Sequence, residues 1–452
     1  MRHGRLAPLP VSLRLVRGIS PLAGLLCLGV VPLRAQSAVT PPSSAWLALL
    51  PDGVTKRQFI IDCTNCHQFD TLVAIPGGRE RSREEWAASV TRMLGYAGAT
   101  TGFPIISAGR DPDSTAAWLV QHLAGRRPAP LTMPLGQAEI TEYEMPVPTD
   151  LPHDVAVDSA GQVLITGMFS HVMYRLDPRT GQMSRVELPA PRSGPRAVEV
   201  DRQGQWWVLL GNAGLMARYA PASGRWSTWP MGMYPHSVTL DADGGAWFNG
   251  HFTRDPEQIG VVDPATGRVE TFAVPPHPTL ARRPGGPIPY EIRAAPDGTL
   301  WGGELQGNRI FSFQRATRRF ETYDLPTPMS GPRRFDIDGS GTLWIPAYSA
   351  NLLVRFDPSS RRFAEFPFPV RDVLPYVVRV DHRREVLWIG TAGADLVFRF
   401  DPRTLAFTAY RLPSAGALVR HLAVDPASGD VWLAYGASPG RISARIARLR
   451  AR

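Results

Sequence analysis

Short runs of alternating apolar and polar residues, separated by Gly, Pro and Asp, fill the chain from about residue 138 onward. One unit recurs seven times: a Pro-X pair (Arg420-His421 in the last copy), an alternating run, an Asp, a Gly turn, and a Trp or Leu about twelve residues after the pair begins. The second residues of these pairs lie 43, 40, 54, 43, 43 and 45 positions apart. Period-2 runs indicate strands, and repeats of this length are typical of propeller blades. The pattern predicts an all-β, seven-bladed β-propeller over residues 138–452.

The ends of the repeat region predict how the propeller closes. The seventh copy ends without an outermost strand, and a matching segment, residues 139–146, stands before the first copy. We expect this segment to complete the last blade, because that arrangement leaves no open sheet edge.

The residues that follow the repeat prolines are expected to meet at one end of the central channel. Imidazole, guanidinium and phenol groups dominate this set and favour an anionic or carbonyl-containing ligand, although such positions also bind channel water. Glu291 and Glu304 are the carboxylates expected nearest to it. The predicted ring is His153, Arg196, His236, Tyr290, Arg333, Tyr376 and His421 or its neighbour Arg420.

Residues 40–125 follow a helical pattern instead. Ser82 and Glu85 fit a capping box, and apolar residues then recur at helical spacing. A further helix is expected over residues 115–123, and the proline-rich residues 126–137 indicate an extended linker. The sequence therefore predicts a multidomain protein, with a small all-α domain before the propeller.

The segment Cys63-Thr64-Asn65-Cys66-His67 carries the most specific chemistry in the chain. Two thiols at this spacing can form thioethers to the vinyl groups of a haem, and the adjacent imidazole can bind the iron as its proximal ligand. This motif predicts one covalently bound haem c and a cytochrome c-like character for the helical domain; a partial zinc site or a chance occurrence of the motif is the alternative. The remaining cysteine, Cys27, lies in the N-terminal apolar run, so no disulfide framework is expected.

The partner of His67 across the iron is less well specified by the sequence. Met93 is the expected sixth ligand, since it is the only methionine between His67 and Met133. Met93 also fits the apolar stripe of its own helix. His122, Met133 or an open sixth position are the alternatives.

Residues 1–37 resemble an export signal. Arginines precede a short apolar run from Ile19 to Val31, and small residues follow at Ala35, Ser37 and Ala38. Haem attachment occurs outside the cytoplasmic membrane, so we expect a periplasmic protein with no membrane span after cleavage, an uncleaved tether being the alternative. Five of the arginines behind the net charge of +9 lie in this segment. The others are scattered, which argues against nucleic-acid binding.

The repeats Pro235-His236-Ser237 through Ala246-Trp247-Phe248 and Pro296-Asp297-Gly298-Thr299-Leu300-Trp301 resemble the streptogramin B lyase (virginiamycin B lyase) family. The resemblance covers residues 138–452. It implies a propeller that opens a cyclic depsipeptide lactone by Mg²⁺-dependent elimination, with a His after a repeat proline as the base. Pro152-His153 and Pro235-His236 match that element, so His236 and His153 are the candidate catalytic bases.

The chain departs from that family at the metal ligands. The family has a Glu immediately before its Pro-His pair, whereas Leu151 and Tyr234 stand there in this sequence. The second family Glu has a counterpart in Glu304 alone, in the blade whose ring residue is Tyr290. The sequence therefore gives weak grounds for a Mg²⁺ site.

The N-terminal region resembles the small monohaem domains found beside quinoprotein-type and propeller dehydrogenases, through Cys63 to His67 and through residues 85–93. Three functions follow as hypotheses. The first is a periplasmic oxidoreductase that binds or oxidises a substrate at the ring and passes electrons to a cytochrome or an oxidase. The second is a lyase using His236 or His153. The third is a propeller that docks the cytochrome onto another protein.

Overall fold

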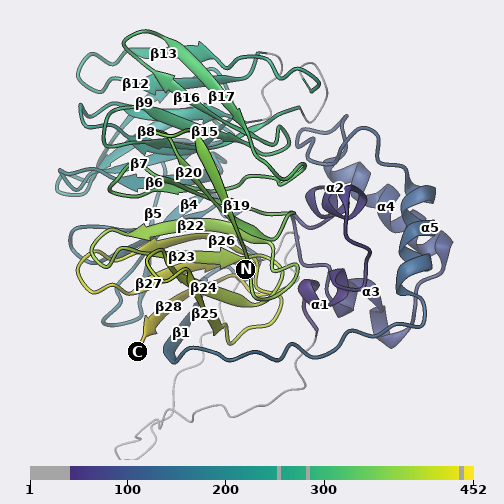
Figure 1. Cartoon of the computed structure of the whole chain (residues 1–452). Helices are drawn as coiled ribbons and strands as arrows, with labels where there is room; N and C mark the ends of the chain where they lie inside the picture. Colours follow the sequence, from purple (N-terminus) through teal and green to yellow (C-terminus); the bar gives the residue numbers. More distant parts are fainter. Residues whose placement is uncertain (1–40, 252–255, 281–285, 437–441) are drawn as a thin grey trace, which may run out of the picture. The chain divides into compact units, whose positions relative to one another are not determined.

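Helices occupy the chain between residues 43 and 123 (Figure 1). The structure is a computed structural model that describes residues 41–251, 256–280, 286–436 and 442–452. The predicted signal segment, residues 1–37, lies outside the described residues. None of the described helices is long and apolar enough to cross a lipid bilayer. The helical elements are α1 (Ser43–Leu47), α2 (Val54–Cys63), α3 (Thr71–Ala74), η1 (Pro76–Gly78), α4 (Arg83–Ala97) and α5 (Pro112–Leu123).

The start of α4 is fixed by the capping box that the sequence predicts. The Ser82 hydroxyl accepts a hydrogen bond from the Glu85 amide, and the Glu85 carboxylate accepts one from the Ser82 amide. These two bonds satisfy amide groups that have no partner within the helix. Helix α5 begins in a related way, with Asp111 as N-cap and Pro112 in the first turn.

Seven four-stranded antiparallel sheets follow, which confirms the predicted propeller. Each blade is given from its innermost strand outward. The first three blades are β2–β5 (Pro152–Val157, Val163–Gly167, Val172–Leu176, Met183–Val186), β6–β9 (Pro195–Val200, Trp206–Leu210, Leu215–Ala220, Arg225–Pro230) and β10–β13 (Pro235–Leu240, Ala246–Gly250, Gln258–Val262, Val269–Ala273). The next three are β14–β17 (Pro289–Ala294, Leu300–Glu304, Arg309–Gln314, Arg319–Asp324), β18–β21 (Asp336–Ile337, Leu343–Ala347, Leu352–Asp357, Arg362–Pro367) and β22–β25 (Pro375–Asp381, Val386–Thr391, Leu396–Asp401, Ala406–Arg411), and the seventh combines β26–β28 (Val419–Val424, Val431–Tyr435, Arg445–Ala451) with β1 (Ala138–Glu144).

The repeated Asp and Trp hold the first turn of a blade together. In the third blade, Asp241 accepts a hydrogen bond from the Gly245 amide at 2.7 Å, and its other oxygen accepts one from the Trp247 indole at 2.7 Å. The same indole–carboxylate bond joins Trp207 to Asp201 and Trp344 to Asp338. One carboxylate therefore fixes both the turn and the large side chain that packs between blades.

The last blade closes the propeller as predicted. Strand β1 pairs antiparallel with β28, and every residue of β1 has a partner, from Ala138 opposite Ala451 to Glu144 opposite Arg445. The outermost strand of the final blade thus comes from the chain segment before the first blade.

The helices and the propeller share one hydrophobic core. Trp46, Phe59 and Leu119 of the helical region belong to the same buried cluster as Leu374 and Tyr376 of the sixth blade. Polar contacts add to this interface, since Lys56 forms a buried ion pair with Asp372 at 2.7 Å and Gln68 donates to Asp395 at 2.8 Å. The surface that the helices cover is the one on which the inner strands begin.

The segment between the helices and the propeller, residues 126–137, contains no helix or strand. Leu131 and Met133 pack against the apolar cluster of the sixth blade, and the Gly136 amide donates to the Ala409 carbonyl at 2.8 Å. A Cβ atom at Gly136 would lie 2.6 Å from side-chain atoms of Thr408 and Tyr410, so the close approach of this segment to strand β25 requires glycine here.

Candidate functional site

The segment with the two cysteines follows directly on helix α2, which ends at Cys63. Both thiols are free and do not form a disulfide. Burial raises the pKa of the Cys63 thiol to about 12 and also raises that of Cys66. The Nδ1 atom of His67 lies 2.9 Å from the Gln68 carbonyl oxygen. With a proton on Nδ1, the Nε2 atom is the nitrogen suited to bind a metal.

A cavity, which we call the motif cavity, lies beside this segment. Its walls include Cys63, His67 and, from α4, Met93. Phe59, Phe69, Trp86 and Leu119 give it an apolar lining. The two candidate haem ligands, His67 and Met93, thus border one largely apolar cavity of about 130 Å³.

The alternative sixth ligands lie elsewhere. His122 makes an edge-to-face contact with Trp118 at 5.7 Å between ring centroids and lines neither the motif cavity nor the cavity described below. Met133 packs against the sixth blade. Among the described residues, no three His, Cys, Asp or Glu side chains converge to hold a metal ion, so the zinc alternative finds no ligand set there.

The residues that follow the repeat prolines are turned toward the channel by irregular pairing. In six blades the register of the innermost strand shifts just after its first residue, as between Pro152 and Val155 or Pro289 and Glu291. A bulge of this kind redirects the side chain next to it. The fifth blade reaches the same result with isolated bridges at Pro332 and Arg334.

A second cavity of about 360 Å³, which we call the rim cavity, connects these residues to the cysteine segment. From the helical region it is lined by Cys63, Cys66, His67 and Met93, and from the propeller it is lined by His153, Arg196, His251, Tyr290, Arg333, Tyr376 and Arg420. Its volume falls within the range of about 300–1,000 Å³ that is usual for small-molecule sites.

Direct contacts join the cysteine segment to the ring. Arg333 donates to the side-chain oxygen of Asn65, and Arg420 donates to the carbonyl oxygens of Asn65 and Cys66 at 3.1 and 3.2 Å. The Thr64 hydroxyl lies 2.8 Å from the Tyr348 hydroxyl. The segment therefore lies directly over the start of the inner strands.

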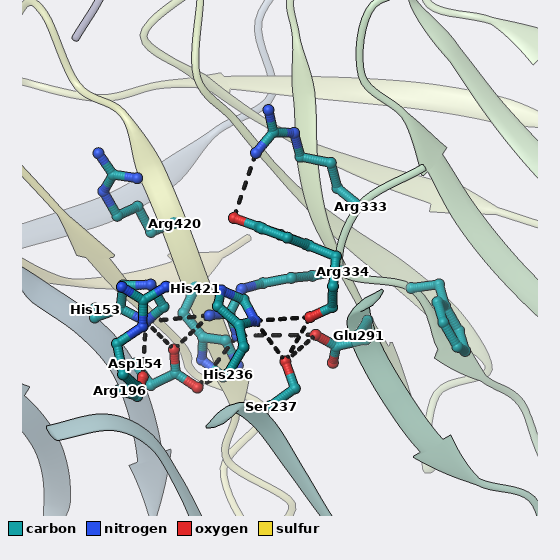
Figure 2. Close-up of polar contacts among 12 residues, drawn as sticks. His153, Asp154, Arg196, His236, Ser237, Glu291, Arg333, Arg334, Arg420 and His421 are labelled. Atoms are coloured by element: carbon teal, nitrogen blue, oxygen red, sulfur yellow. Dashed lines mark hydrogen bonds and ion pairs between the residues drawn. The ribbon is translucent and has the colours of Figure 1, made fainter. Parts of the chain in front are cut away.

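His153 and Tyr290 are the predicted catalytic residues that reach the rim cavity. The Nδ1 atom of His153 lies 2.7 Å from the Arg196 carbonyl oxygen, 2.8 Å from the Asp154 carboxylate and 3.1 Å from the Arg334 guanidinium (Figure 2). Burial, followed by the charge of Arg196, lowers the pKa of His153 to about 3. The imidazole is therefore neutral at ordinary pH and can accept a proton.

His236 lies beneath this layer and is fully buried. Its ring centroid is 4.3 Å from those of both His251 and Tyr290, and its Nδ1 donates to the Tyr290 carbonyl at 2.7 Å. Its Nε2 atom has no hydrogen-bond partner among the described residues. Burial lowers its pKa well below the usual range, so His236 is a neutral base that does not line the rim cavity.

Tyr290 and Tyr376 form a hydrogen-bonded pair of phenols within the cavity wall. The Arg333 guanidinium stacks against both rings, at 5.3 and 4.5 Å from their centroids, and against Tyr348 at 3.8 Å. Burial raises the pKa of Tyr290. For Tyr376, burial is outweighed by the charges of Arg333, Arg420 and Arg334, which lower its pKa.

A network of ion pairs lies further along the channel, and we call it the inner ion-pair network. It contains Arg293, Arg334 and Arg379 with the carboxylates of Asp154, Glu199, Glu291 and Asp336. Arg334 lies 2.8 Å from Asp154, Arg293 lies 2.7 Å from Glu199, and Arg379 lies 3.3 Å from Glu291. His421 belongs here, 2.6 Å from Arg379, so its neighbour Arg420 occupies the ring position.

The carboxylates that the sequence places near the ring are already neutralised. Glu304 is fully buried and receives two hydrogen bonds from Arg309, at 2.6 and 2.8 Å, away from the rim cavity. Glu291 is paired with Arg293 at 3.0 Å. With Leu151 and Tyr234 at the family's metal-binding positions, the described residues do not fit a Mg²⁺ ion.

Several residues of the site went unrecognised in the sequence. Asp154 and Arg334 immediately follow ring residues, and the alternation of the inner strand should place them one step deeper in the channel. Their shared signal is their position relative to the repeat prolines.

The virginiamycin B lyase family model matches residues 180–444. A solved streptogramin B lyase is 20% identical, covers 70% of this chain and 98% of its own, and gives a TM-score of 0.61. Selenomethionine-substituted virginiamycin B lyase from Staphylococcus aureus is 19% identical, with 70% and 100% coverage and a TM-score of 0.60. Hydrazine synthase from Kuenenia stuttgartiensis is 15% identical, with 68% and 97% coverage and a TM-score of 0.53.

No curated protein matched the sequence. At such identities the solved structures show a common fold and nothing finer. The family match is of a different kind, since it spans more than half of the chain and includes blades whose Asp-Gly-Trp turns and bulged prolines have been described above. The chain belongs to the virginiamycin B lyase family.

Proposed function

We propose that this protein is an exported, periplasmic c-type cytochrome in which a haem on Cys63, Cys66 and His67 lies next to a substrate bound at the propeller ring. One observation carries the proposal: the cysteine segment, Met93 and six ring residues line the same cavity. A fused but functionally separate cytochrome would have no reason to direct its haem motif into the propeller channel.

The residues around the motif cavity fit a haem. His67 would offer an imidazole and Met93 a thioether to this cavity. A haem bound there would supply one-electron transfer. Phe59, Phe69 and Trp86 would keep water from its faces.

The ring residues would then bind and orient the substrate. Neutral His153 can accept a proton, the Tyr290–Tyr376 pair can donate or accept hydrogen bonds, and the arginines can hold negative charge. The electron acceptor would be a soluble cytochrome or a terminal oxidase that reaches the outer side of the helical region.

The first experiment is a reduced-minus-oxidised spectrum of protein that has been exported and matured in a host able to attach haem c. We expect the α band of a thioether-linked haem, and pigment that stays with the protein in acidified organic solvent. Cys63→Ala with Cys66→Ala should abolish the covalent link. A colourless mature protein, or pigment extracted by acid solvent, would refute the proposal.

The ligand assignment needs matched variants. Met93→Leu should remove the spectral signature of a thioether ligand and lower the reduction potential, because Met ligation raises it. Met133→Leu and His122→Asn are the controls, and both should leave the spectrum unchanged. The same result for Met93→Leu as for the controls would show that Met93 is not a ligand.

A lyase-type elimination is a second candidate, favoured by two observations: the chain belongs to a lyase family, and His236 holds a buried Nε2 atom without a partner among the described residues. In such a reaction, a neutral His153 or His236 would remove the proton as the lactone opens. Incubation with a streptogramin B and chromatography of the product tests this. His153→Ala and His236→Ala should each abolish ring opening, and an intact lactone with the wild-type protein would exclude it.

A further inference from the structure

The rim cavity contains an imbalance of charge that the proposed function does not explain. Three arginines line it: Arg196, Arg333 and Arg420, which we call the rim arginines. They are 7%, 1% and 7% exposed, so all three are more than nine-tenths buried. A buried guanidinium is costly unless an opposite charge lies beside it.

No carboxylate pairs with the rim arginines among the described residues. Arg196 has the Met168 sulfur at 3.5 Å and the Tyr234 ring at 5.3 Å. Arg333 has Tyr290, Asn65 and the stacked tyrosines, and Arg420 has the Tyr376 hydroxyl at 3.5 Å and two carbonyl oxygens. The Nε atom of each arginine is buried without a hydrogen-bond partner in the same described part of the chain.

The single acidic residue in the cavity lining does not neutralise them. Asp62 already accepts two hydrogen bonds from Arg110, at 2.6 and 2.8 Å, and two from Ser107. Within the described lining, the rim arginines therefore face His153, His251 and the tyrosines, whose side chains carry no negative charge in their ordinary neutral forms.

The remaining walls of the rim cavity are apolar. Phe103, Ile105, Leu151, Phe169 and Leu305 line it together with the arginines. A ligand that suits both the apolar walls and the arginines needs a hydrocarbon body and a negatively charged, planar group. Such a group can accept two hydrogen bonds from one guanidinium.

We propose that Arg196, Arg333 and Arg420 form a binding site for the carboxylate of a small organic acid, whose hydrocarbon part lies against Phe103, Leu151 and Leu305. This inference rests on the proposed function only in taking the rim cavity as the substrate site. The lowered pKa of Tyr376 agrees with it, since the same arginines favour a negative charge on that phenol.

A carboxylate could reach the rim arginines from two sources: a soluble acid or the propionates of the haem. Arg333 and Arg420 contact the cysteine segment, whereas Arg196 lies beside Met168 and Tyr234. Arg196 is therefore the residue whose substitution best separates the two sources.

The test uses the full-length, haem-loaded protein, with benzoate as the probe and benzyl alcohol as its uncharged counterpart. Calorimetry should detect benzoate binding, and benzoate but not benzyl alcohol should raise the melting temperature. Arg196→Gln should weaken benzoate binding about tenfold to a hundredfold, the usual loss for a charge-assisted hydrogen bond. Arg202→Gln, in an exposed turn, is the matched control and should bind as the wild type does.

Two results would overturn the organic-acid site. Benzoate and benzyl alcohol could act alike on the wild-type protein, a comparison that needs no variant to fold. Alternatively, benzoate could fail to bind while Arg196→Gln, Arg333→Gln and Arg420→Gln each shift the reduction potential, which would assign the arginines to the propionates. Benzoate binding by a protein that proves to lack haem would refute the proposed function and leave this site standing.

Discussion

The two layers of charge in the propeller channel contain the same number of arginines and differ in what surrounds them. In the inner ion-pair network, Arg293, Arg334 and Arg379 meet four carboxylates. In the rim cavity, Arg196, Arg333 and Arg420 meet tyrosines, carbonyl oxygens and a thioether. In the first layer, each arginine has a carboxylate partner among the described residues. The second is incomplete within the described residues, which is what a ligand site requires.

The largest expected effect follows from breaking the inner network. Arg334→Met leaves Asp154, which is buried, without its 2.8 Å partner. We expect the free energy of unfolding to fall by about 3–5 kcal/mol, as for other buried pairs that lose one partner. Urea titration measures this. The double variant Arg334→Met, Asp154→Leu should recover most of the loss, and an equally unstable double variant would show that the pair is not the cause.

The second prediction concerns pH and tests His153, which contacts both layers. Its folded-state pKa of about 3 is below the value of about 6.5 in an unfolded chain, so its contribution to stability is present above pH 6.5 and is lost as the pH falls. Between pH 7 and 5 this amounts to about 2 kcal/mol of unfolding free energy. Urea titrations at pH 7 and pH 5 should show that His153→Gln loses about 2 kcal/mol less unfolding free energy than the wild type over this range.

Asp395 is the control for that pH series, since its effect has the opposite sign. Burial raises its pKa to about 6, although hydrogen bonds from Gly416 and Gln68 oppose the shift. A carboxyl whose folded-state pKa is raised loses its stabilising contribution as the pH rises from about 4 through 6. The Asp395 contribution therefore partly offsets the stability that His153 loses at low pH. Asp395→Asn should remove this offset and make the loss of unfolding free energy between pH 7 and 5 larger. A series unchanged by either variant would contradict both assignments.

The third prediction concerns the effect on stability of replacing an arginine of the rim cavity. Arg196→Met removes a buried charge that has no acidic partner among the described residues, so the unfolding free energy in ligand-free buffer should stay within about 1 kcal/mol of the wild type or rise. The same urea titration as for Arg334→Met gives the contrast directly. A loss as large as that of Arg334→Met would erase the distinction between the two layers.

The smallest expected effect is on Tyr376. Tyr376→Phe removes the phenol whose pKa the arginines lower, so the ultraviolet titration should lose one tyrosine that ionises before the others. Stability should change by about 1 kcal/mol or less, because Tyr376 loses a hydroxyl and keeps its packing. Tyr219→Phe, outside the channel, is the control. An identical titration for both variants would show that the arginines do not lower the pKa of Tyr376.

The propeller could be predicted from the sequence because each blade repeats a local solution. The Asp-Gly-Trp turn and the leading proline act over about twelve residues, so periodicity alone reveals them. Ring closure was also predictable, since one missing outer strand matched one unpaired segment.

The site was predictable in part, and the reason is distance along the chain. The ring positions can be predicted from the repeat. The candidate haem-binding residues can be predicted from the motif Cys63-Thr64-Asn65-Cys66-His67. Pairings such as Arg334 with Asp154, 180 residues apart, depend on how blades face one another. The contact of Asn65 with Arg333 depends on docking the helices onto the propeller, and no local pattern encodes it.

The burial of Thr64 and Asn65 beneath Tyr348, Arg333 and Arg420 has a consequence for the order of assembly. An enzyme that attached the proposed haem to the flanking cysteines would need access to a segment that the finished propeller covers. Attachment would therefore precede docking. The antiparallel pairing of β1 with β28 allows this order, because the propeller cannot close until residues 445–451 are available to pair with β1.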